Sequence, residues 1–469
     1  MGKYYLAVDI GASSGRHILG HLENGKIELE EIYRFENGMD HKDGKLLWNV
    51  DRLFGEILNG MKKCKELGKI PVSMAIDTWA VDYVLLDEQD RILGDTYGYR
   101  DHRTDGMDAE VAKILPETEL YAKTGIQKQI FNTIYQLMAV KEKEPELLQR
   151  AKTLLMLPDY FGFRLTGNKL SEYTNGSTTQ LVNPTTFQWD TDLIRKLGYP
   201  EDIFLPLQMP GTKVGQLLPE IQKEVGFNLE VVLCGSHDTA SAVMAVPQAS
   251  GDGIYISSGT WSLMGIESLK PIINKDAAAA NFTNEGGYDH RFRFLKNIMG
   301  LWMIQSVRHE YSDAYSFAQL CEMAEDSRDF PSRVDVNDPS FLSPDSMVEA
   351  IKKYCQKTGQ PVPESVGELA SVVYRSLAQS YGETVSSLEK IAGRTYDSIH
   401  IIGGGSNAAY LNQLTADATG KTVYAGPGEA TAIGNLLAQM IYAEELTDLK
   451  SARQCVRDSF EIKTFVPAK

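Results

Sequence analysis

The sequence predicts an α/β protein built from two large domains, and three observations support this fold class. Apolar segments with strand patterning alternate with segments of helical spacing along the whole chain. The 469 residues exceed what one ordinary core accommodates, so at least two domains are expected. A strand–glycine turn–strand pattern near the N-terminus recurs at residues 252–268, which indicates an internal duplication with a boundary near residues 246–252.

The first half opens with strands and then alternates. Residues 4–11 read as a strand, and the residues up to 36 continue it as a meander with a turn at Asn24-Gly25. Residues 51–67 carry apolar side chains at helical spacing. Two strands flank Thr78-Trp79-Ala80, and residues 146–156 are expected to be helical.

The second half repeats this order. After the strand pair of residues 252–268, helices are expected around 301–311, 345–357 and 365–391. Residues 398–420 then read as a strand, a glycine loop and a helix. Two α/β domains that face each other would leave a cleft between them.

Composition limits the class of protein. With 47 Lys and Arg against 63 Asp and Glu, the net charge is −16, which argues against a nucleic-acid partner. The five cysteines are widely spaced without a C-x-x-C pair, so neither a disulfide framework nor a structural zinc site is expected. No signal peptide and no apolar run of about 18 residues is evident. We therefore expect a soluble, cytoplasmic protein without a membrane partner.

Three glycine turns are candidates for phosphate binding: residues 9–16, 257–262 and 403–406. Each alone is most simply a hairpin or the start of a helix. Glycine is required where φ is positive or where a ligand approaches the backbone. Two hairpins of one design in two repeated halves, followed by a triglycine loop, predict two hairpins that bind phosphates and a third loop over a nucleoside.

Other nucleotide signatures fit less well. Gly420-Lys421-Thr422 lacks the glycine that a Walker A loop needs five residues earlier, where Thr415 stands. Residues 403–408 match G-x-G-x-x-A, the dinucleotide fingerprint, after a strand. An NAD-dependent oxidoreductase therefore stays open as an alternative.

A His-Asp pair, His237-Asp238, lies at a strand-to-helix corner. Residues 231–233 read as a buried strand and residues 239–246 as the start of a helix. Ser236 or Asp238 could cap the first helical turn. Alternatively, Asp238 could be a general base, because ligands of open α/β sheets bind at the carboxyl ends of strands.

Several motifs together resemble the FGGY carbohydrate kinases, the sugar-kinase branch of the actin-like ATPases. The resemblance runs from about residue 4 to about residue 440 and is carried by "GASSGR", "IDTWAVDYVLLD", "YRDHRT", "NTIYQL", "PDYFGFRLTG", "SHDTASAV", "SSGTWSLMG" and "GGGSNAAYLNQLTADATG". It implies two ribonuclease-H-like domains around a central cleft that closes over its substrates. The implied division is a sugar-binding domain at 1–247, a nucleotide-binding domain at 248–445 and a C-terminal tail at 446–469.

The resemblance also implies an activity. Such kinases move the γ-phosphoryl group of ATP, held with Mg²⁺, to a sugar hydroxyl and release ADP. The motifs above, together with "EYTNGSTTQL", "NEGG" and "KNIMGLW", more closely resemble the branch that phosphorylates L-rhamnulose on its 1-hydroxyl in L-rhamnose catabolism. Ala80 stands where that branch usually has glycine, so L-fuculose or L-xylulose stay open as substrates. A non-enzymatic actin-like sugar sensor is a further alternative, and a monomer or homodimer is expected.

The resemblance assigns roles to individual residues. It makes Asp238 the catalytic base and Asp9 the residue that holds Mg²⁺. The residues implied to bind ATP are Ala12, Ser13, Ser14, Gly15, Arg16, Thr260, Gln305 and Gly403. The residues implied to contact the sugar are Ala80, His237, Asp238, Thr239 and Asn297.

Overall fold

The computed structural model describes residues 2–248 and 252–468, which divide into two compact units. Unit 1 comprises the chain up to Ala245 together with Ser268–Phe294 and Thr431–Ser459. Unit 2 comprises Val246–Glu267, Leu295–Ala430 and the chain from Phe460 onward. Two segments that follow residue 247 thus pack with unit 1, and the assignment of sugar and nucleotide binding to separate domains stays a prediction.

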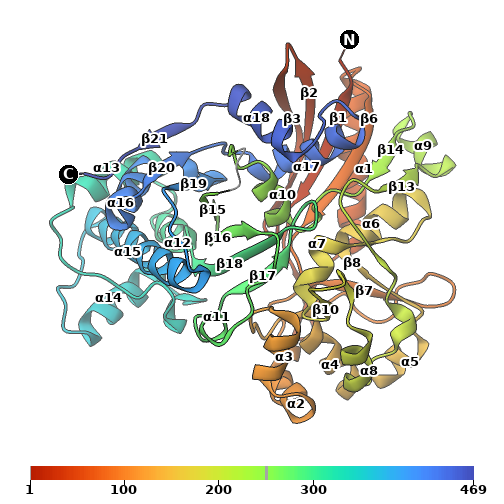
Figure 1. The fold of residues 1–469 in the computed structure, drawn as a ribbon, viewed down its shortest axis with the longest axis horizontal. Coiled ribbons are helices and arrows are strands. Elements are labelled where there is room, and N and C mark those ends of the chain that lie inside the picture. The colour runs from red at the N-terminus through yellow and green to blue at the C-terminus, as the bar shows by residue number, and fades with distance from the viewer. Residues whose placement is uncertain (1, 249–251, 469) are drawn as a thin grey trace. The chain divides into compact units, whose positions relative to one another are not determined.

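Unit 1 is built on a six-stranded sheet with the strand order β13-β14-β6-β1-β2-β3 (Figure 1). Strands β1, β6 and β14 run parallel, whereas β1, β2 and β3 form the antiparallel meander that the sequence predicts. The strands are β1 Tyr4–Ile10, β2 Ser14–Glu23, β3 Lys26–Glu36, β6 Pro71–Thr78, β13 Lys213–Gln216 and β14 Glu230–Val232.

Alternation along β1 directs side chains to the two faces of this sheet. Leu6, Val8 and Ile10 join one buried cluster, and Tyr5 and Ala7 join another. Since successive residues of a strand point to opposite faces, each face of the sheet has its own core.

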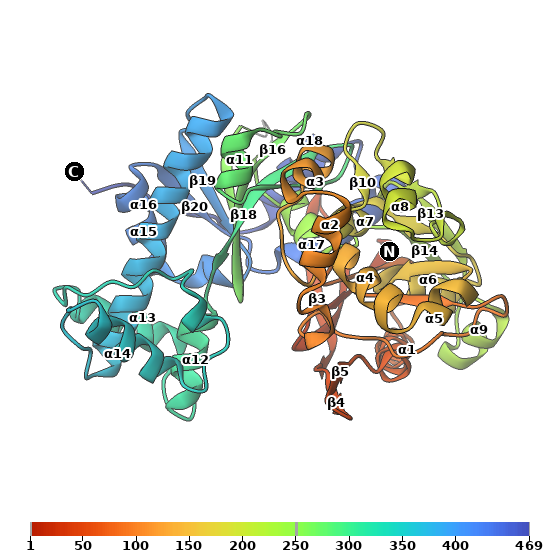
Figure 2. The same cartoon turned by 90° about the horizontal axis from the view of Figure 1, so that it is seen from below.

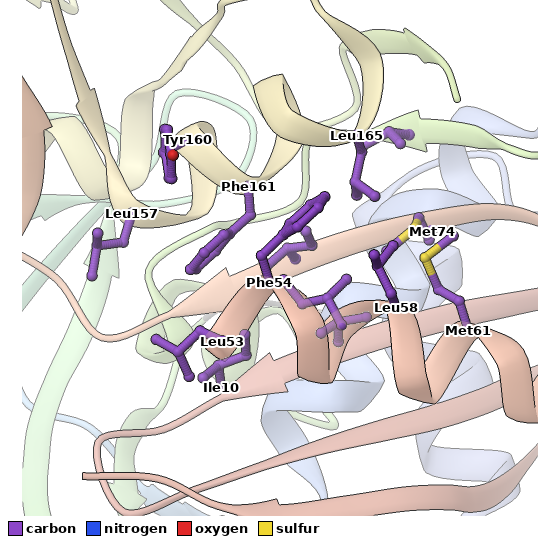
Figure 3. Packing of buried hydrophobic residues seen from close by; sticks show 14 of the residues in the cluster. Ile10, Leu53, Phe54, Leu58, Met61, Met74, Leu157, Tyr160, Phe161 and Leu165 are labelled. Atoms are coloured by element: carbon purple, nitrogen blue, oxygen red, sulfur yellow. The ribbon is translucent and has the colours of Figure 1, made fainter. Parts of the chain in front are cut away.

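Helices cover both faces. Helices α1 (Val50–Glu66) and α6 (Leu157–Thr166) contribute to the first cluster, where Figure 3 shows their side chains lying beside those of the strands. Helix α17 (Ala430–Tyr442) contributes to the second cluster from the segment that returns to unit 1.

The rest of unit 1 consists of short elements, many of them between β6 and β13. Its helices are α2 Met107–Ile114, α3 Glu117–Thr124, α4 Thr133–Lys143, α5 Pro145–Arg150, α7 Tyr173–Gly176, α8 Thr191–Leu197, α9 Pro219–Val225, α10 Asp238–Met244, α11 Lys275–Ala279 and α18 Leu449–Ser459. Its further strands are β4 Asp40–Lys42, β5 Lys45–Leu47, β7 Tyr83–Leu86, β8 Thr153–Met156, β9 Ser171–Glu172, β10 Val182–Asn183, β11 Gln188–Trp189, β12 Leu207–Gln208 and β17 Thr283–Gly286.

Unit 2 repeats the strand–turn–strand opening. Strands β15 (Ile254–Ser258) and β16 (Trp261–Ser268) are antiparallel, and β15 pairs in parallel with β19. Strand β18 (Phe292–Met299) begins in unit 1 and ends in unit 2. The remaining elements are β19 Ser398–Ile402, β20 Thr422–Ala425, β21 Lys463–Phe465, α12 Trp302–Glu310, α13 Phe317–Asp326, α14 Met347–Lys357, α15 Val366–Ala392 and α16 Ala409–Thr419. Figures 1 and 2 show the long helix α15 beside α13 and α16.

One predicted element is wrong in part. Residues 146–156 do not form one helix, because α5 ends at Arg150 and Thr153–Met156 is strand β8, paired with β7. A short apolar run such as this fits a buried strand as well as a helix, and only the tertiary pairing decides. Among the described residues, no helix is long and apolar enough to cross a membrane.

Candidate active site

The parallel strands of unit 1 bring acidic residues to one edge of the sheet. Asp9 near the end of β1 is in register with Asp77 near the end of β6. After β14, the chain continues this edge, because Thr78 donates its N–H to Ser236 O (2.9 Å) and pairs with His237. Asp238 follows directly, so three carboxylates lie at the carboxyl ends of neighbouring parallel strands, where open α/β sheets bind ligands.

Asp9 and Arg16 form an ion pair across the first hairpin. They are opposite each other in the β1–β2 register, and Arg16 donates from Nε (3.0 Å) and Nη2 (2.9 Å) to Asp9 Oδ2. The two side chains are only 11% and 21% exposed, which strengthens the interaction relative to a surface pair. The residue implied to hold the metal and the cation implied to face phosphate therefore contact each other.

The hairpin turn is held by backbone contacts. Gly11 N–H donates to Ser14 O (2.8 Å), and Asn37 donates its side-chain amide to Gly11 O (2.8 Å). Gly15 is required here, because a Cβ at this position would lie 2.1 Å from the ring of Phe35. This turn presents the other residues implied to bind phosphate, namely Ala12, Ser13 and Ser14.

Asp77 is a buried carboxylate that the sequence analysis did not single out. Its Oδ2 accepts a hydrogen bond from Asn435 of α17 (2.6 Å), while Oδ1 has no partner among the described residues. Burial raises the pKa of Asp77 well above its usual range, and the negative charge of Asp9 raises it further. Its position directly before the end of a strand, like that of Asp9, is the signal that could have identified it.

Asp238 is the first residue of α10 and keeps a partly exposed side chain. Oδ1 accepts hydrogen bonds from Thr239 N (2.5 Å) and Thr239 Oγ1 (3.1 Å). The side chain is 35% exposed, so a carboxylate oxygen is accessible to a proton donor. The N-cap residue of α10 is His237, so Asp238 satisfies only the N–H of the residue that follows it and keeps the capacity to act as a base.

The corner before Asp238 is anchored by Glu172, a buried acid that the sequence analysis missed. Its Oε2 accepts from Ser236 Oγ (2.6 Å) and Ser236 N (3.2 Å), so the Ser236 hydroxyl does not cap α10. Glu172 also accepts from Thr174 N (2.7 Å) and Asn175 N (2.9 Å) at the start of α7. Burial raises the pKa of Glu172, and these donors lower it, with burial the larger effect.

A third buried carboxylate, Asp82, fixes the segment after β6. Its Oδ2 accepts from the indole N–H groups of Trp48 (2.6 Å) and Trp79 (2.9 Å) and from Tyr99 N (3.1 Å). Its Oδ1 accepts from Gln136 Nε2 (2.9 Å). Burial raises the pKa of Asp82 to about 6 although all four donors lower it.

Ala80 lies in the tight turn between Trp79 and Asp82. Its carbonyl accepts from Asp82 N (2.9 Å), and the residue is partly exposed. Val81 has φ of 67°, a left-handed conformation that is costly for a β-branched residue. Thr133 holds this conformation by donating to Val81 O (2.7 Å).

Unit 2 brings together three of the residues implied to bind ATP. Thr260 lies in the turn between β15 and β16, and its carbonyl accepts from Trp302 N (3.1 Å) at the start of α12, the helix that carries Gln305. Gly403 follows β19 with φ of 81°, and a Cβ there would lie 2.9 Å from Ser258 O. The second hairpin, α12 and the glycine loop therefore pack against one another.

Asn297 also belongs to unit 2. It lies on β18, and its Oδ1 is buried without a hydrogen-bond partner in the described part of the chain. The other residues implied to contact the sugar lie in unit 1. In the ranges that the structure describes, no three His, Cys, Asp or Glu residues are grouped so that they could hold a metal ion.

Comparison with known proteins identifies the family. The N-terminal domain of the FGGY family of carbohydrate kinases matches residues 4–245, and the C-terminal domain matches residues 254–443. The chain belongs to the FGGY family of carbohydrate kinases. This FGGY kinase is therefore an enzyme that phosphorylates a sugar, and kinases of the family use ATP.

Curated relatives match this FGGY kinase over nearly its full length. Proteins named rhamnulokinase from Halalkalibacterium halodurans and Oceanobacillus iheyensis are 54% and 51% identical, over 99% of this chain and 99% and 98% of theirs. The rhamnulokinase of Bacillus subtilis is 47% identical over 99% of this chain and 95% of its own. The resemblance that the sequence motifs indicate is confirmed.

Solved structures confirm the fold class. A ligand-bound xylulose kinase from Lactobacillus acidophilus has a TM-score of 0.79 at 16% identity, covering 99% of this chain and 94% of that one. A Plasmodium falciparum glycerol kinase with ADP has a TM-score of 0.76 at 14% identity, with coverage of 99% and 94%. This FGGY kinase therefore has the two-domain, mixed α/β fold of sugar kinases of the actin-like ATPase type.

Proposed function

We propose that this FGGY kinase is a rhamnulokinase, which transfers the γ-phosphoryl group of ATP to the 1-hydroxyl of L-rhamnulose in L-rhamnose catabolism. The products are L-rhamnulose 1-phosphate and ADP. The observation that carries the choice of substrate is identity of 42–54% over nearly the whole chain to relatives named rhamnulokinase. Neither an NAD-dependent oxidoreductase nor a non-enzymatic sensor is favoured by membership of a kinase family.

Asp238 acts as the general base in this proposal. A sugar hydroxyl must lose its proton as it attacks phosphorus, and a carboxylate within hydrogen-bond reach accepts that proton. The contacts of Thr239 hold one carboxylate oxygen of Asp238, and the partial exposure of the side chain supports access for a hydroxyl. Glu172 keeps this corner in place through Ser236.

The phosphate groups would be bound by the two hairpins. Main-chain N–H groups of Ala12, Ser13, Ser14 and Gly15 are suited to phosphate oxygens, and Arg16 supplies a positive charge near them. Thr260 in the equivalent hairpin of unit 2, together with Gln305 and Gly403, would bind the rest of ATP. The contacts of the second hairpin with the start of α12 and with Gly403 support this role.

Mg²⁺ fits the residues at the edge of the sheet. Carboxylate oxygen is the ligand that Mg²⁺ prefers, and an ion that arrives with ATP needs only one or two carboxylates besides phosphate and water. Asp9 would hold it, and Asp77, whose buried Oδ1 has no partner among the described residues, lies opposite Asp9 in the sheet register. When bound, Mg²⁺ neutralises charge on the phosphates.

The sugar would be bound by Ala80, His237, Thr239 and Asn297. Ala80 adds a methyl group in the turn that Val81 and Asp82 hold rigid, so the fit of the ketose depends on this position. We expect L-fuculose and L-xylulose to be accepted weakly. The enzyme is proposed to act in the cytoplasm as a monomer or homodimer.

A coupled ADP-release assay over a panel of ketoses and aldoses tests the proposed substrate. We expect the highest kcat/KM with L-rhamnulose, lower values with L-fuculose and L-xylulose, and no reaction when Mg²⁺ is removed by a chelator. A preference for glycerol or an aldose over L-rhamnulose would show that the assignment within the family is wrong.

A further inference from the structure

His237 lies between Asp238 and a buried ion pair that none of the roles above uses. Its Nδ1 is 3.0 Å from Arg293 Nη2, and its Nε2 is 3.4 Å from Asp238 Oδ1. The Arg293 side chain is 0% exposed and is paired with Glu285, whose Oε2 lies 3.1 Å from Nη2. A fully buried guanidinium is costly unless it is paired and hydrogen-bonded, so this arrangement calls for an explanation.

The Arg293 contact determines which ring nitrogen of His237 carries the proton. A guanidinium has N–H donors and no acceptor, and it stays protonated in proteins. At 3.0 Å from Nη2, Nδ1 must therefore accept the hydrogen bond. A neutral imidazole has one N–H, so the proton lies on Nε2, the nitrogen that faces Asp238.

The contact with Glu285 does not change which ring nitrogen of His237 carries the proton. Its Oε2 lies 3.4 Å from His237 Nδ1, farther than the guanidinium nitrogen, and this oxygen makes no hydrogen bond within the described residues. Burial raises the pKa of Glu285, but the charge of Arg293 helps to hold the pKa below its usual range. Glu285 is thus the counter-charge that allows Arg293 to be buried.

Hydrogen bonds from the surrounding chain fix both Arg293 and the backbone of His237. Arg293 donates from Nε to Gly286 O (2.8 Å), and Gly286 N–H donates to Ser177 Oγ (2.8 Å). The backbone N–H of His237 donates to Thr174 Oγ1 (3.3 Å). The imidazole is therefore held from its backbone and from its Nδ1 side.

We propose that His237 is a positioning residue for Asp238: Arg293 fixes the Nε2–H tautomer, so that the ring turns an N–H toward Asp238 Oδ1 at 3.4 Å. The Thr239 N–H and hydroxyl donate to the same oxygen, so all these contacts hold Oδ1 and leave Oδ2 to accept the proton of the sugar hydroxyl. This deepens the role implied for His237 as a sugar contact and rests on the proposed function for its kinetic part.

The tautomer is tested without substrate by ¹⁵N NMR of the full-length protein labelled on histidine at neutral pH. We expect the His237 ring, assigned from the signals lost in His237→Phe, to show a protonated Nε2 and an unprotonated Nδ1. His17 is an internal reference in the same spectrum, because its Nε2 contacts the carbonyl of Ile57 (3.1 Å) and burial lowers its pKa to about 4. A protonated Nδ1 at His237 would overturn the proposal.

Kinetics with L-rhamnulose and ATP test the positioning role. His237→Phe keeps a ring without an N–H donor, and we expect kcat to fall about 10- to 100-fold and the sugar KM to rise by a smaller factor, since the ring also contacts the sugar in the proposed function. His237→Gln keeps a donor and should recover part of the lost kcat. If His237 is only a sugar contact, the KM rises in both variants while kcat stays, and the proposal fails.

The role of Arg293 is tested with the paired variant Arg293→Met/Glu285→Gln, which removes both charges together and leaves no unpaired buried charge. We expect the His237 signals to shift toward the other tautomer, the His17 signals to stay in place, and kcat to fall. Unchanged His237 signals would contradict the part assigned to Arg293. If wild-type protein is inactive on L-rhamnulose, the proposed function fails, while the NMR result still decides the tautomer.

Discussion

At the scale of single residues, three carboxylates at the ends of parallel strands define the candidate site of unit 1. Asp9, Asp77 and Asp238 have different surroundings: an ion pair, full burial and partial exposure. These surroundings decide what each can do, because burial keeps a carboxyl protonated, a cation keeps it charged, and solvent access lets it exchange a proton. Among these three, only Asp238 has one carboxylate oxygen fixed by hydrogen bonds from Thr239 and a side chain that is partly exposed to solvent.

Asp238→Asn separates the base from a helix cap. Asn still accepts from Thr239 N–H and is nearly as good as Asp at a helix start, but it does not accept the hydroxyl proton. We expect kcat to fall by about 10²–10⁴ with the melting temperature and the affinities for ATP and sugar close to wild type. A fully active variant would return Asp238 to the role of a cap.

Asp82 predicts a pH dependence of stability. Its pKa is about 6 in the folded protein against 3.8 in the unfolded chain, so the unfolded chain gives up this proton first as pH rises. The contribution of Asp82 to the free energy of unfolding should therefore fall by about 2 kcal/mol between pH 4 and pH 7. Denaturant titrations of wild type and Asp82→Asn should show a difference that falls over this window.

Asp87 is expected to contribute to stability with the opposite pH dependence to that of Asp82. Hydrogen bonds from Arg91 lower the pKa of Asp87, so its contribution to stability is present at neutral pH and lost as pH falls through that lowered value. Parallel curves for wild type and Asp82→Asn between pH 4 and pH 7 would contradict the raised pKa of Asp82.

Some of the residues of the candidate site could be predicted from the sequence, and others could not. The positions of Asp9 and Asp238 at the ends of apolar runs identify them as candidates. Glu172 lies 64 residues from Ser236, and Arg293 lies 56 residues from His237. No local pattern relates such pairs, because tertiary folding alone brings them together.

At the scale of secondary structure, α10 and α17 show how the corner with Asp238 is supported. A Cβ on Gly434 of α17 would lie 1.7 Å from Ser241 O of α10, so glycine is required at this point of a helix. Arg453 of α18 donates from Nη2 to Val243 O (2.9 Å) near the end of α10. Helices from the last part of the chain therefore hold both the side and the end of α10.

Gly434→Ala tests this packing. The added methyl group must displace α10, so we expect a loss of about 1–3 kcal/mol in the free energy of unfolding and a lower kcat, because α10 begins at Asp238. Gly55→Ala in α1 is the matched control, since no atom lies within 4 Å of the added Cβ. That variant should gain up to about 1 kcal/mol from helix propensity, with unchanged kcat. Equal stability changes in the two variants would contradict the close contact.

The two hairpins and the glycine loop could be predicted at this scale, because alternating apolar residues around glycine specify a tight turn. The packing of Thr431–Ser459 with unit 1 could not be predicted from the sequence. Residues 446–469, expected as a tail, contain α18, which packs on unit 1. Helical periodicity indicates that a helix has an apolar face and does not indicate which surface that face covers.

At the scale of the whole molecule, the sequence predicts two α/β domains of related design, and family membership confirms this class. The contact-defined units do not follow the chain order, since Ser268–Phe294 and Thr431–Ser459 pack with the first unit. Glu285, Arg293 and Asn435 come from these segments and contact residues at the edge of the first sheet or beside Asp238. The candidate site in unit 1 therefore depends on parts of the chain far beyond residue 245.

The central claim, that this FGGY kinase phosphorylates the 1-hydroxyl of L-rhamnulose, is tested most directly by NMR of the product. The enzyme is incubated with L-rhamnulose labelled with ¹³C at C1, ATP and Mg²⁺, and ¹³C and ³¹P spectra are recorded over time. We expect a phosphomonoester whose phosphorus couples to C1, formed in step with ADP and absent with Asp238→Asn on the same time scale. A phosphate on another carbon, or ADP and inorganic phosphate without a phosphomonoester, would contradict this claim.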